Sequence, residues 1–153
     1  MNRAVAMLAI ATLAVATPFL ASCTTDTHGL GGTAAVWAAH HGHDVTPVVD
    51  AHGLVEGYTA RFAPRPLADA VASVRAELPD DATATPPRAA EGIEGTKCEI
   101  VEFTSAKLGR LLGGRDGSHV VAVFETNAAT SMDTNRISQV TVVSANQNIP
   151  YGC

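Results

Sequence analysis

Basic residues are scarce in this sequence, which has ten Lys and Arg against fifteen Asp and Glu and a formal net charge of −5. Nucleic-acid phosphates require a basic surface, so this balance disfavours a nucleic-acid partner. The chain is also short. Its 153 residues, 46% of them apolar, suit one compact domain and exclude two ordinary ones. We therefore expect no multidomain enzyme and no nucleic-acid complex.

Apolar runs long enough to span a membrane are also lacking. The longest, residues 4–20, is shorter than the roughly 20 residues that a spanning helix needs, and Pro18 interrupts it. The positive residue Arg3 precedes this run, and small residues and a cysteine follow it. This order is typical of a cleaved signal peptide rather than of a permanent transmembrane helix.

The end of the run, Leu20-Ala21-Ser22-Cys23, has the form of a lipobox. Small residues let a signal peptidase close around the backbone, and the cysteine sulfur accepts a diacylglyceryl group. Here the chain resembles the bacterial lipoprotein family. The resemblance implies cleavage of residues 1–22, thioether lipidation of Cys23 and a further acyl chain, such as palmitate, on the new amino group.

Two or three acyl chains, at about 0.8 kcal/mol per buried methylene, would hold the protein on the extracytoplasmic face of the cell membrane. The alternatives are an ordinary secretory signal with a coincidental cysteine, and an uncleaved membrane anchor.

Cysteine is rare, with three in the whole chain. If Cys23 carries lipid, Cys98 and Cys153 remain in an oxidising compartment, where pairing is the simplest outcome. Closing a loop of this length stabilises a domain by roughly 3–4 kcal/mol on the chain-entropy estimate. The alternatives are a reactive thiol or a metal thiolate, although the sequence has no CxxC spacing.

Polar and glycine-rich residues 24–32 predict a tether, and Pro47 is expected to end any regular element in the segment that follows. We therefore predict a tether and irregular histidine-containing segment over residues 23–53. A compact domain over residues 54–153 is expected to follow.

Within that domain, apolar residues at helical spacing predict a helix over 67–78, with prolines at both ends. Val, Ile and Thr enrichment predicts strands, a serine or threonine cap predicts a short helix, and proline and threonine predict a loop. The strands are 54–62, 97–103, 119–125 and 136–144, the short helix is 105–112, and the loop is 80–95. The pattern predicts an α+β fold, a small, largely antiparallel sheet with one main helix packed on one face.

The group most capable of chemistry comprises His40, His41, His43 and Asp44. Imidazole and carboxylate ligands suit Zn²⁺. However, HExxH spacing is absent, and adjacent side chains in a helix or strand point in different directions. The alternative is a solvated polar loop, and we expect weak zinc binding at best, with no other cofactor.

Two further patterns in the sequence bear on function. Asp116, Ser118 and His119 contain the residue types of a hydrolase, but no GxSxG elbow exposes the serine. An exposed Trp37 beside the histidines would be a binding contact. No phosphate-binding glycine loop occurs.

We therefore expect a non-enzymatic, lipid-anchored binding or interaction module, whose partner is an envelope protein or a small ligand. A metal-capturing lipoprotein and an envelope hydrolase are the alternatives. In its Ala-, Arg- and Thr-rich composition and its two late cysteines, the mature part resembles small lipoproteins of high-GC Gram-positive bacteria. That resemblance implies a location and no activity.

Overall fold

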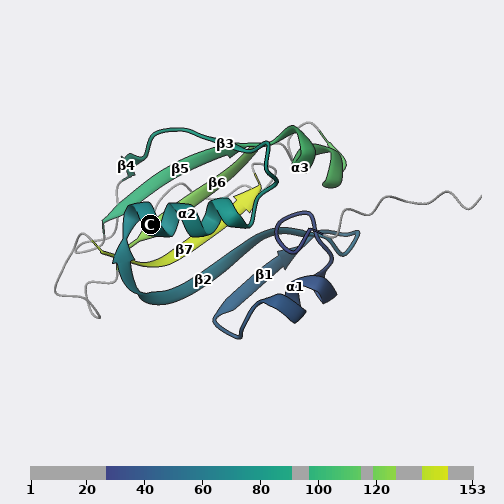
Figure 1. Cartoon of the computed structure of the whole chain (residues 1–153), viewed down its shortest axis with the longest axis horizontal. Coiled ribbons are helices and arrows are strands. Elements are labelled where there is room, and N and C mark those ends of the chain that lie inside the picture. The colour runs from purple at the N-terminus through teal and green to yellow at the C-terminus, as the bar shows by residue number, and fades with distance from the viewer. Residues whose placement is uncertain (1–26, 91–96, 115–118, 127–135, 145–153) are drawn as a thin grey trace, which may run out of the picture.

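A computed structural model of the chain describes residues 27–90, 97–114, 119–126 and 136–144. These residues form a seven-stranded, antiparallel sheet with three helices, an α+β arrangement (Figure 1). The strands are β1 (Val45–Val49), β2 (Val55–Pro66), β3 (Thr83–Ala84), β4 (Arg88–Ala90), β5 (Cys98–Thr104), β6 (His119–Glu125) and β7 (Arg136–Ser144). The helices are α1 (Ala34–His40), α2 (Leu67–Ala76) and α3 (Ala106–Leu111). The strand order is β1-β2-β7-β6-β5-β3, and β4 also pairs with β5.

The central strands agree best with the sequence. β6 and β7 have the predicted bounds, and β5 is shifted by one residue. β6 lies between β5 and β7, and five consecutive residues, 120–124, are buried. β-branched and apolar side chains are favoured there because both faces of the strand are covered.

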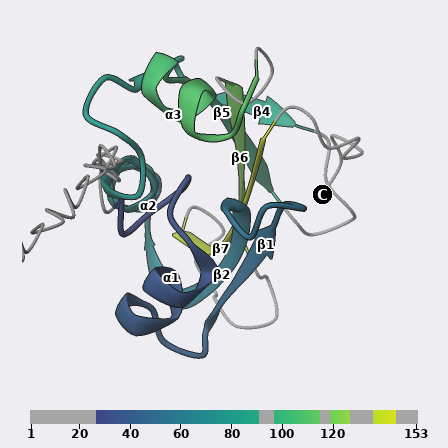
Figure 2. The same cartoon turned by 90° about the vertical axis from the view of Figure 1, so that its right-hand side faces the viewer.

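Alternate residues of the central strands contribute to two separate clusters. Phe103, Phe124 and Val142 belong to the larger cluster, which also holds Ala70 and Val74 of α2. The smaller cluster on the other face consists of Ile100, Val121, Val123 and Val143, with Ala90 against it. Figure 2 shows α1 and α2 on the same side of the sheet.

Most of residues 34–49 lie in α1 and β1, with a turn over residues 41–44 between them, so the prediction of an irregular segment there is wrong. Thr33 caps α1, and its Oγ1 accepts a 3.3 Å hydrogen bond from the Val36 N–H. β1 contains Pro47 and pairs antiparallel with β2, with a register shift between Val48 and Val49. Proline is tolerated because β1 is the edge strand of the sheet.

The described residues of the predicted tether pack against the domain instead of extending away from it. Leu30 is 1% exposed and joins the larger cluster. Its N–H donates a 2.9 Å hydrogen bond to the Glu77 carbonyl at the end of α2. A Cβ on Gly29 would lie 2.1 Å from that same carbonyl oxygen, so only glycine allows this approach. Residues 23–26 lie outside the described residues, and the predicted cleavage and lipidation sites are among residues 1–26.

The remaining differences are smaller. β2 continues four residues beyond the predicted strand, and the predicted loop over 80–95 contains the short strands β3 and β4, both paired with β5. Within the four described ranges, no helix has the length and apolar character needed to cross a membrane.

Candidate functional site

A pocket of about 470 Å³ lies where three distant segments of the chain meet. This volume is within the range of about 300–1,000 Å³ that is usual for small-molecule sites. The pocket combines apolar side chains with two cations and one carboxylate. Its lining residues are Thr27, Pro79, Asp80, Lys107, Arg110 and Leu111, and we call it the Lys107 pocket.

The first wall of the Lys107 pocket is supplied by the segment that precedes α1. Thr27 is placed by the residues after it, because Leu30 is buried in the core and Gly29 packs on the backbone of Glu77. The Gly31 N–H donates a 2.8 Å hydrogen bond to the Val55 carbonyl, which ties the segment to β2 as well. This wall is therefore held by the core.

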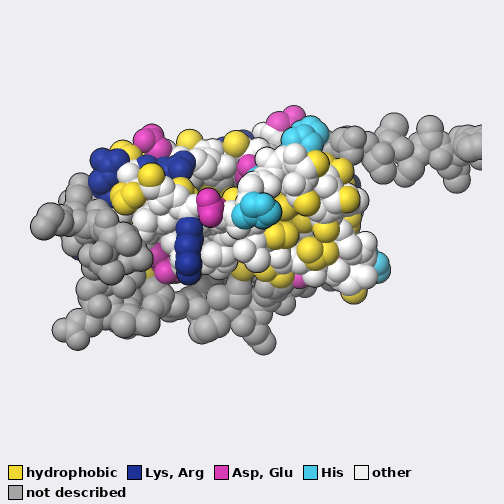
Figure 3. Space-filling view, turned by 90° about the horizontal axis from the view of Figure 1, so that it is seen from below, with side chains coloured by type: hydrophobic (Ala, Val, Ile, Leu, Met, Phe, Trp, Pro, Cys, Tyr) yellow, Lys and Arg dark blue, Asp and Glu magenta, His cyan; other side chains and the backbone are white. Residues whose placement is uncertain are grey.

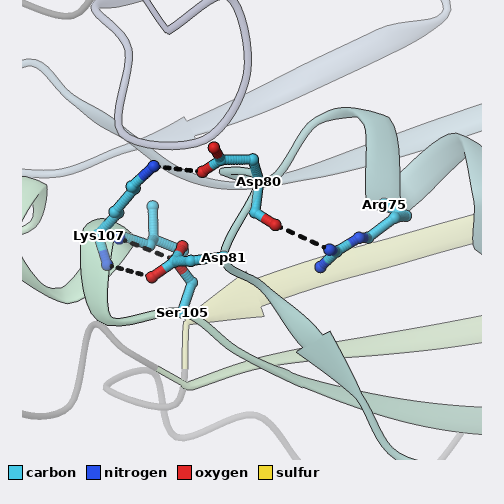
Figure 4. A network of polar contacts seen from close by, with 6 residues as sticks. Arg75, Asp80, Asp81, Ser105 and Lys107 are labelled. Atoms are coloured by element: carbon cyan, nitrogen blue, oxygen red, sulfur yellow. Dashed lines mark hydrogen bonds and ion pairs between the residues drawn. The ribbon is translucent and has the colours of Figure 1, made fainter.

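The second wall, Pro79 and Asp80, directly follows α2. The helix predicted over 67–78 ends two residues early, because α2 ends at Ala76 with Glu77 as its C-cap, and Pro79 lies in the turn that follows. The Arg75 guanidinium donates a 3.1 Å hydrogen bond back to the Asp80 carbonyl (Figure 4). The turn is thus attached to the helix that precedes it.

The third wall is α3, whose start is fixed by hydrogen bonds. The Ser105 hydroxyl accepts a 3.0 Å bond from the Leu108 N–H, which confirms the predicted cap. The same hydroxyl donates a 2.6 Å hydrogen bond to the Asp81 carboxylate. The carboxylate also accepts a 2.9 Å hydrogen bond from the Lys107 N–H. The hydrogen bond from Ser105 holds the pKa of Asp81 below its usual value.

Lys107 and Asp80 form an ion pair at the rim of the pocket (Figure 4). The hydrogen bond and charge of Lys107 hold the pKa of the Asp80 carboxyl below its usual value. Both side chains are well exposed, at 49% and 81%, so the pair contributes little to stability. Lys107 and Arg110 are three residues apart on α3, which places them on one side of the helix.

The four residues of the predicted metal group do not converge. The His40 ring lies against His28, with ring centres 4.0 Å apart, and the His41 ring stacks on Trp37 at 3.8 Å. His43 and Asp44 line a separate depression of about 320 Å³ over β1 and β2, together with Thr46, Thr59 and Arg61. In the parts of the chain that the structure describes, no cluster of three or more metal-binding side chains occurs.

His41 has a structural role between α1 and α2. Its Nδ1 lies 3.0 Å from the Trp37 carbonyl oxygen, and its Nε2 lies 3.1 Å from the Glu77 carboxylate. These two contacts fix the orientation of the ring between the Trp37 carbonyl and the Glu77 carboxylate. The nearby Tyr58 phenol has a pKa raised by burial first and by the Glu77 charge second, which keeps the phenol neutral.

Trp37 is 1% exposed, so its predicted role as an exposed binding contact is wrong. It packs between the His41 ring and Tyr58, whose ring centre is 5.1 Å away. Figure 3 shows apolar side chains gathered beside the histidines at one end of the molecule. Within α1, the exposed residues are His40 and three alanines, Ala35, Ala38 and Ala39.

The hydrolase pattern and the predicted disulfide fall partly outside the described residues. Asp116, Ser118 and Cys153 are in the undescribed ranges. His119 lies at the start of β6, with its Nδ1 3.5 Å from the Thr104 hydroxyl. Cys98 is 2% exposed at the start of β5. The Cys98–Cys153 pairing stays a prediction.

The Lys107 pocket was not anticipated from the sequence. Thr27 and Pro79 are 52 positions apart and Asp80 and Lys107 are 27 positions apart in the chain, and none of the three walls carries a recognisable motif. No known protein family, curated protein or solved structure matches the chain.

Proposed function

We propose that this protein is a lipid-anchored binding module on the extracytoplasmic face of the cell membrane, with the Lys107 pocket as its ligand site. The observation that carries the binding role is the pocket itself, since it combines an apolar wall with two cations and a carboxylate. In this proposal, α2 is the main helix that covers one face of the sheet, and the protein performs no catalysis.

The lipid anchor is supported by the order of charge, apolar run, small residues and cysteine in residues 3–23. Lipidation of Cys23 would leave a mature chain with nine basic and fifteen acidic residues, because Arg3 is removed with the signal peptide. The predicted bridge between Cys98 and Cys153 belongs to the same proposal, because export gives access to an oxidising compartment.

We expect Cys23→Ala to abolish acyl labelling and to remove the protein from the membrane fraction, or to leave an uncleaved precursor there. The physical reason is that no other residue at the lipobox offers a sulfur nucleophile. Metabolic labelling with an alkyne fatty acid, together with intact mass, measures both effects. Thr24→Ala is the matched control and should be labelled and retained. A Cys23→Ala protein that is still cleaved, acylated and retained contradicts the lipid anchor.

Metal capture is the second candidate function, because His43 and Asp44 line the same depression. We expect only weak zinc binding there, since Arg61 places a positive charge in the lining and two ligands are too few for a closed site. Calorimetric titration with Zn²⁺ of the wild type, His43→Ala and the control His52→Ala tests this prediction. Tight stoichiometric binding that is lost only in His43→Ala would make metal capture the leading function.

A further inference from the structure

We infer that the Lys107 pocket faces the membrane and binds the phosphate of an anionic phospholipid headgroup. This inference deepens the proposed function and rests on it for the position of the pocket. It is carried by three features of the chain: the covalent distance from Cys23 to the pocket, the positions of Lys107 and Arg110, and the acidic balance of the protein.

The first feature is covalent reach. Thr27 lines the pocket and follows Cys23 by four residues. Because an extended chain spans at most about 3.6 Å per residue, the Thr27 Cα lies within about 14 Å of the Cys23 Cα in any conformation. A diacylglyceryl group on Cys23 places that cysteine at the bilayer surface. The pocket is then held within reach of the headgroup layer, whereas ligands far from the membrane have no such proximity.

The second feature is the chemistry of the rim. The Arg110 side chain is exposed and lines the pocket one turn of α3 after Lys107. A guanidinium and an ammonium together recognise phosphate oxygens well, because the former donates two parallel hydrogen bonds and the latter adds a mobile charge. Pro79 and Leu111 supply apolar surface beside them for the glycerol and the first methylenes of a lipid.

Asp80 is the group that opposes this binding, because its carboxylate already pairs with Lys107. The pair is exposed, so its loss or sharing costs little. Asp81 competes less, since its two oxygens accept bonds from Ser105 and from the Lys107 backbone. Among the described residues that line the pocket, the titratable side chains are two cations and one carboxylate, so their summed charge is positive.

The third feature is overall charge. The mature chain, with nine basic and fifteen acidic residues once Arg3 is removed, is repelled by an anionic membrane surface. General electrostatic adsorption relies on clusters of about 4–8 basic residues, which is more than the two cations at this pocket. Two cations therefore favour a single headgroup seated in a defined pocket, where its phosphate would contact both of them directly, over general adsorption.

The test uses the two lysines of the chain, of which Lys107 lines the pocket and Lys97 is an exposed internal control. The purified full-length protein is acetylated with a water-soluble reagent while dihexanoylphosphatidylglycerol is titrated. Dihexanoylphosphatidylcholine and inorganic phosphate form parallel arms, and mass spectrometry gives the labelling rate of each lysine. We expect phosphatidylglycerol to slow labelling of Lys107 and to leave Lys97 unchanged.

Arg110→Ala should raise the phosphatidylglycerol concentration that gives half-maximal protection about fivefold, the usual effect of one cation near an anionic lipid surface. Arg88→Ala is the matched control, because Arg88 is exposed on β4 and pairs with Glu102 away from the pocket. Equal protection by inorganic phosphate would assign the pocket to a soluble phosphate compound and overturn the lipid assignment.

The proposal that the pocket recognises an anionic headgroup would be overturned by either of two results. One is that phosphatidylcholine protects Lys107 from acetylation as well as phosphatidylglycerol does, and the other is that none of the three compounds protects it. Because these lipids are soluble, the result does not depend on the anchor. Flotation of the protein with phosphatidylcholine vesicles tests the anchor separately. If the protein does not float but phosphatidylglycerol still protects Lys107, the lipid anchor is contradicted and the headgroup site is not.

Discussion

Trp37→Ala is expected to lower the free energy of unfolding by about 3–5 kcal/mol, the usual cost of removing a buried aromatic side chain. Trp37 is 1% exposed, stacks on His41 and contacts Tyr58. Its loss would leave a cavity between α1 and β2 and would release the His41 ring that pairs with Glu77. Urea unfolding followed by circular dichroism measures the change.

Trp37→Phe is the matched control. The Trp37 Nε1 is buried without a hydrogen-bond partner among the described residues, so phenylalanine removes an unsatisfied donor as well as some volume. We expect Trp37→Phe to cost much less than Trp37→Ala. If Trp37→Ala unfolds at the urea concentration of the wild type, then α1 does not contribute to the stability of the core.

The second large effect is expected from the bridge between Cys98 and Cys153. Cys153→Ala should lower the free energy of unfolding by about 3–4 kcal/mol, because it opens a loop of more than fifty residues in the denatured chain. Cys98 lies two residues before Ile100 on β5 and therefore faces the side of the sheet that carries the smaller cluster. The bridge would hold the carboxyl end against that face.

The design separates the bridge from the packing of Cys98 itself. Cys98→Ala also removes a buried sulfur and should cost slightly more, and the double variant should equal Cys98→Ala because the bridge can be lost only once. Non-reducing peptide mapping identifies the linked cysteines. Wild-type stability in Cys153→Ala, or two free thiols in protein from the envelope, contradicts the pairing.

Elements with a strong periodic pattern were predictable from the sequence. β6 and β7 match their predicted bounds because runs rich in Val and Ile are buried on both faces. α2 starts at Leu67 as predicted, after a proline that fixes the first turn. The Ser105 cap of α3 was also found, because a serine hydroxyl satisfies a free N–H at a helix start.

The amino-terminal part of the domain was not predictable in the same way. α1 is seven residues long and mostly alanine, so its apolar pattern is weak, and one side chain, Trp37, supplies its buried residue. Pro47 is compatible with a strand only because β1 lies at an edge, and edge position is a tertiary property. Leu30 is buried by contact with a distant helix end, which a local glycine-rich pattern does not reveal.

The candidate site was missed for a related reason. The histidines indicated a metal site because they are close together in sequence. In the structure, however, His40 and His41 contact different neighbours. Lys107 and Arg110 have ordinary surroundings in sequence, and they became notable when the fold placed Thr27 and Pro79 beside them. Their three-residue spacing was the one signal available, and it is common in any short helix.

If the proposed lipid anchor confines many copies to one membrane, the two edges of the sheet bear on how those copies interact. Pro47 removes a backbone donor from β1, and the register shift after Val48 interrupts its regular pairing, while the opposite edge, in the described part of the chain, consists of the short strands β3 and β4, two and three residues long. An incoming strand from a second copy would find few consecutive donors and acceptors at either edge. The fold thus resists edge-to-edge aggregation at the high local concentrations that confinement to a surface creates.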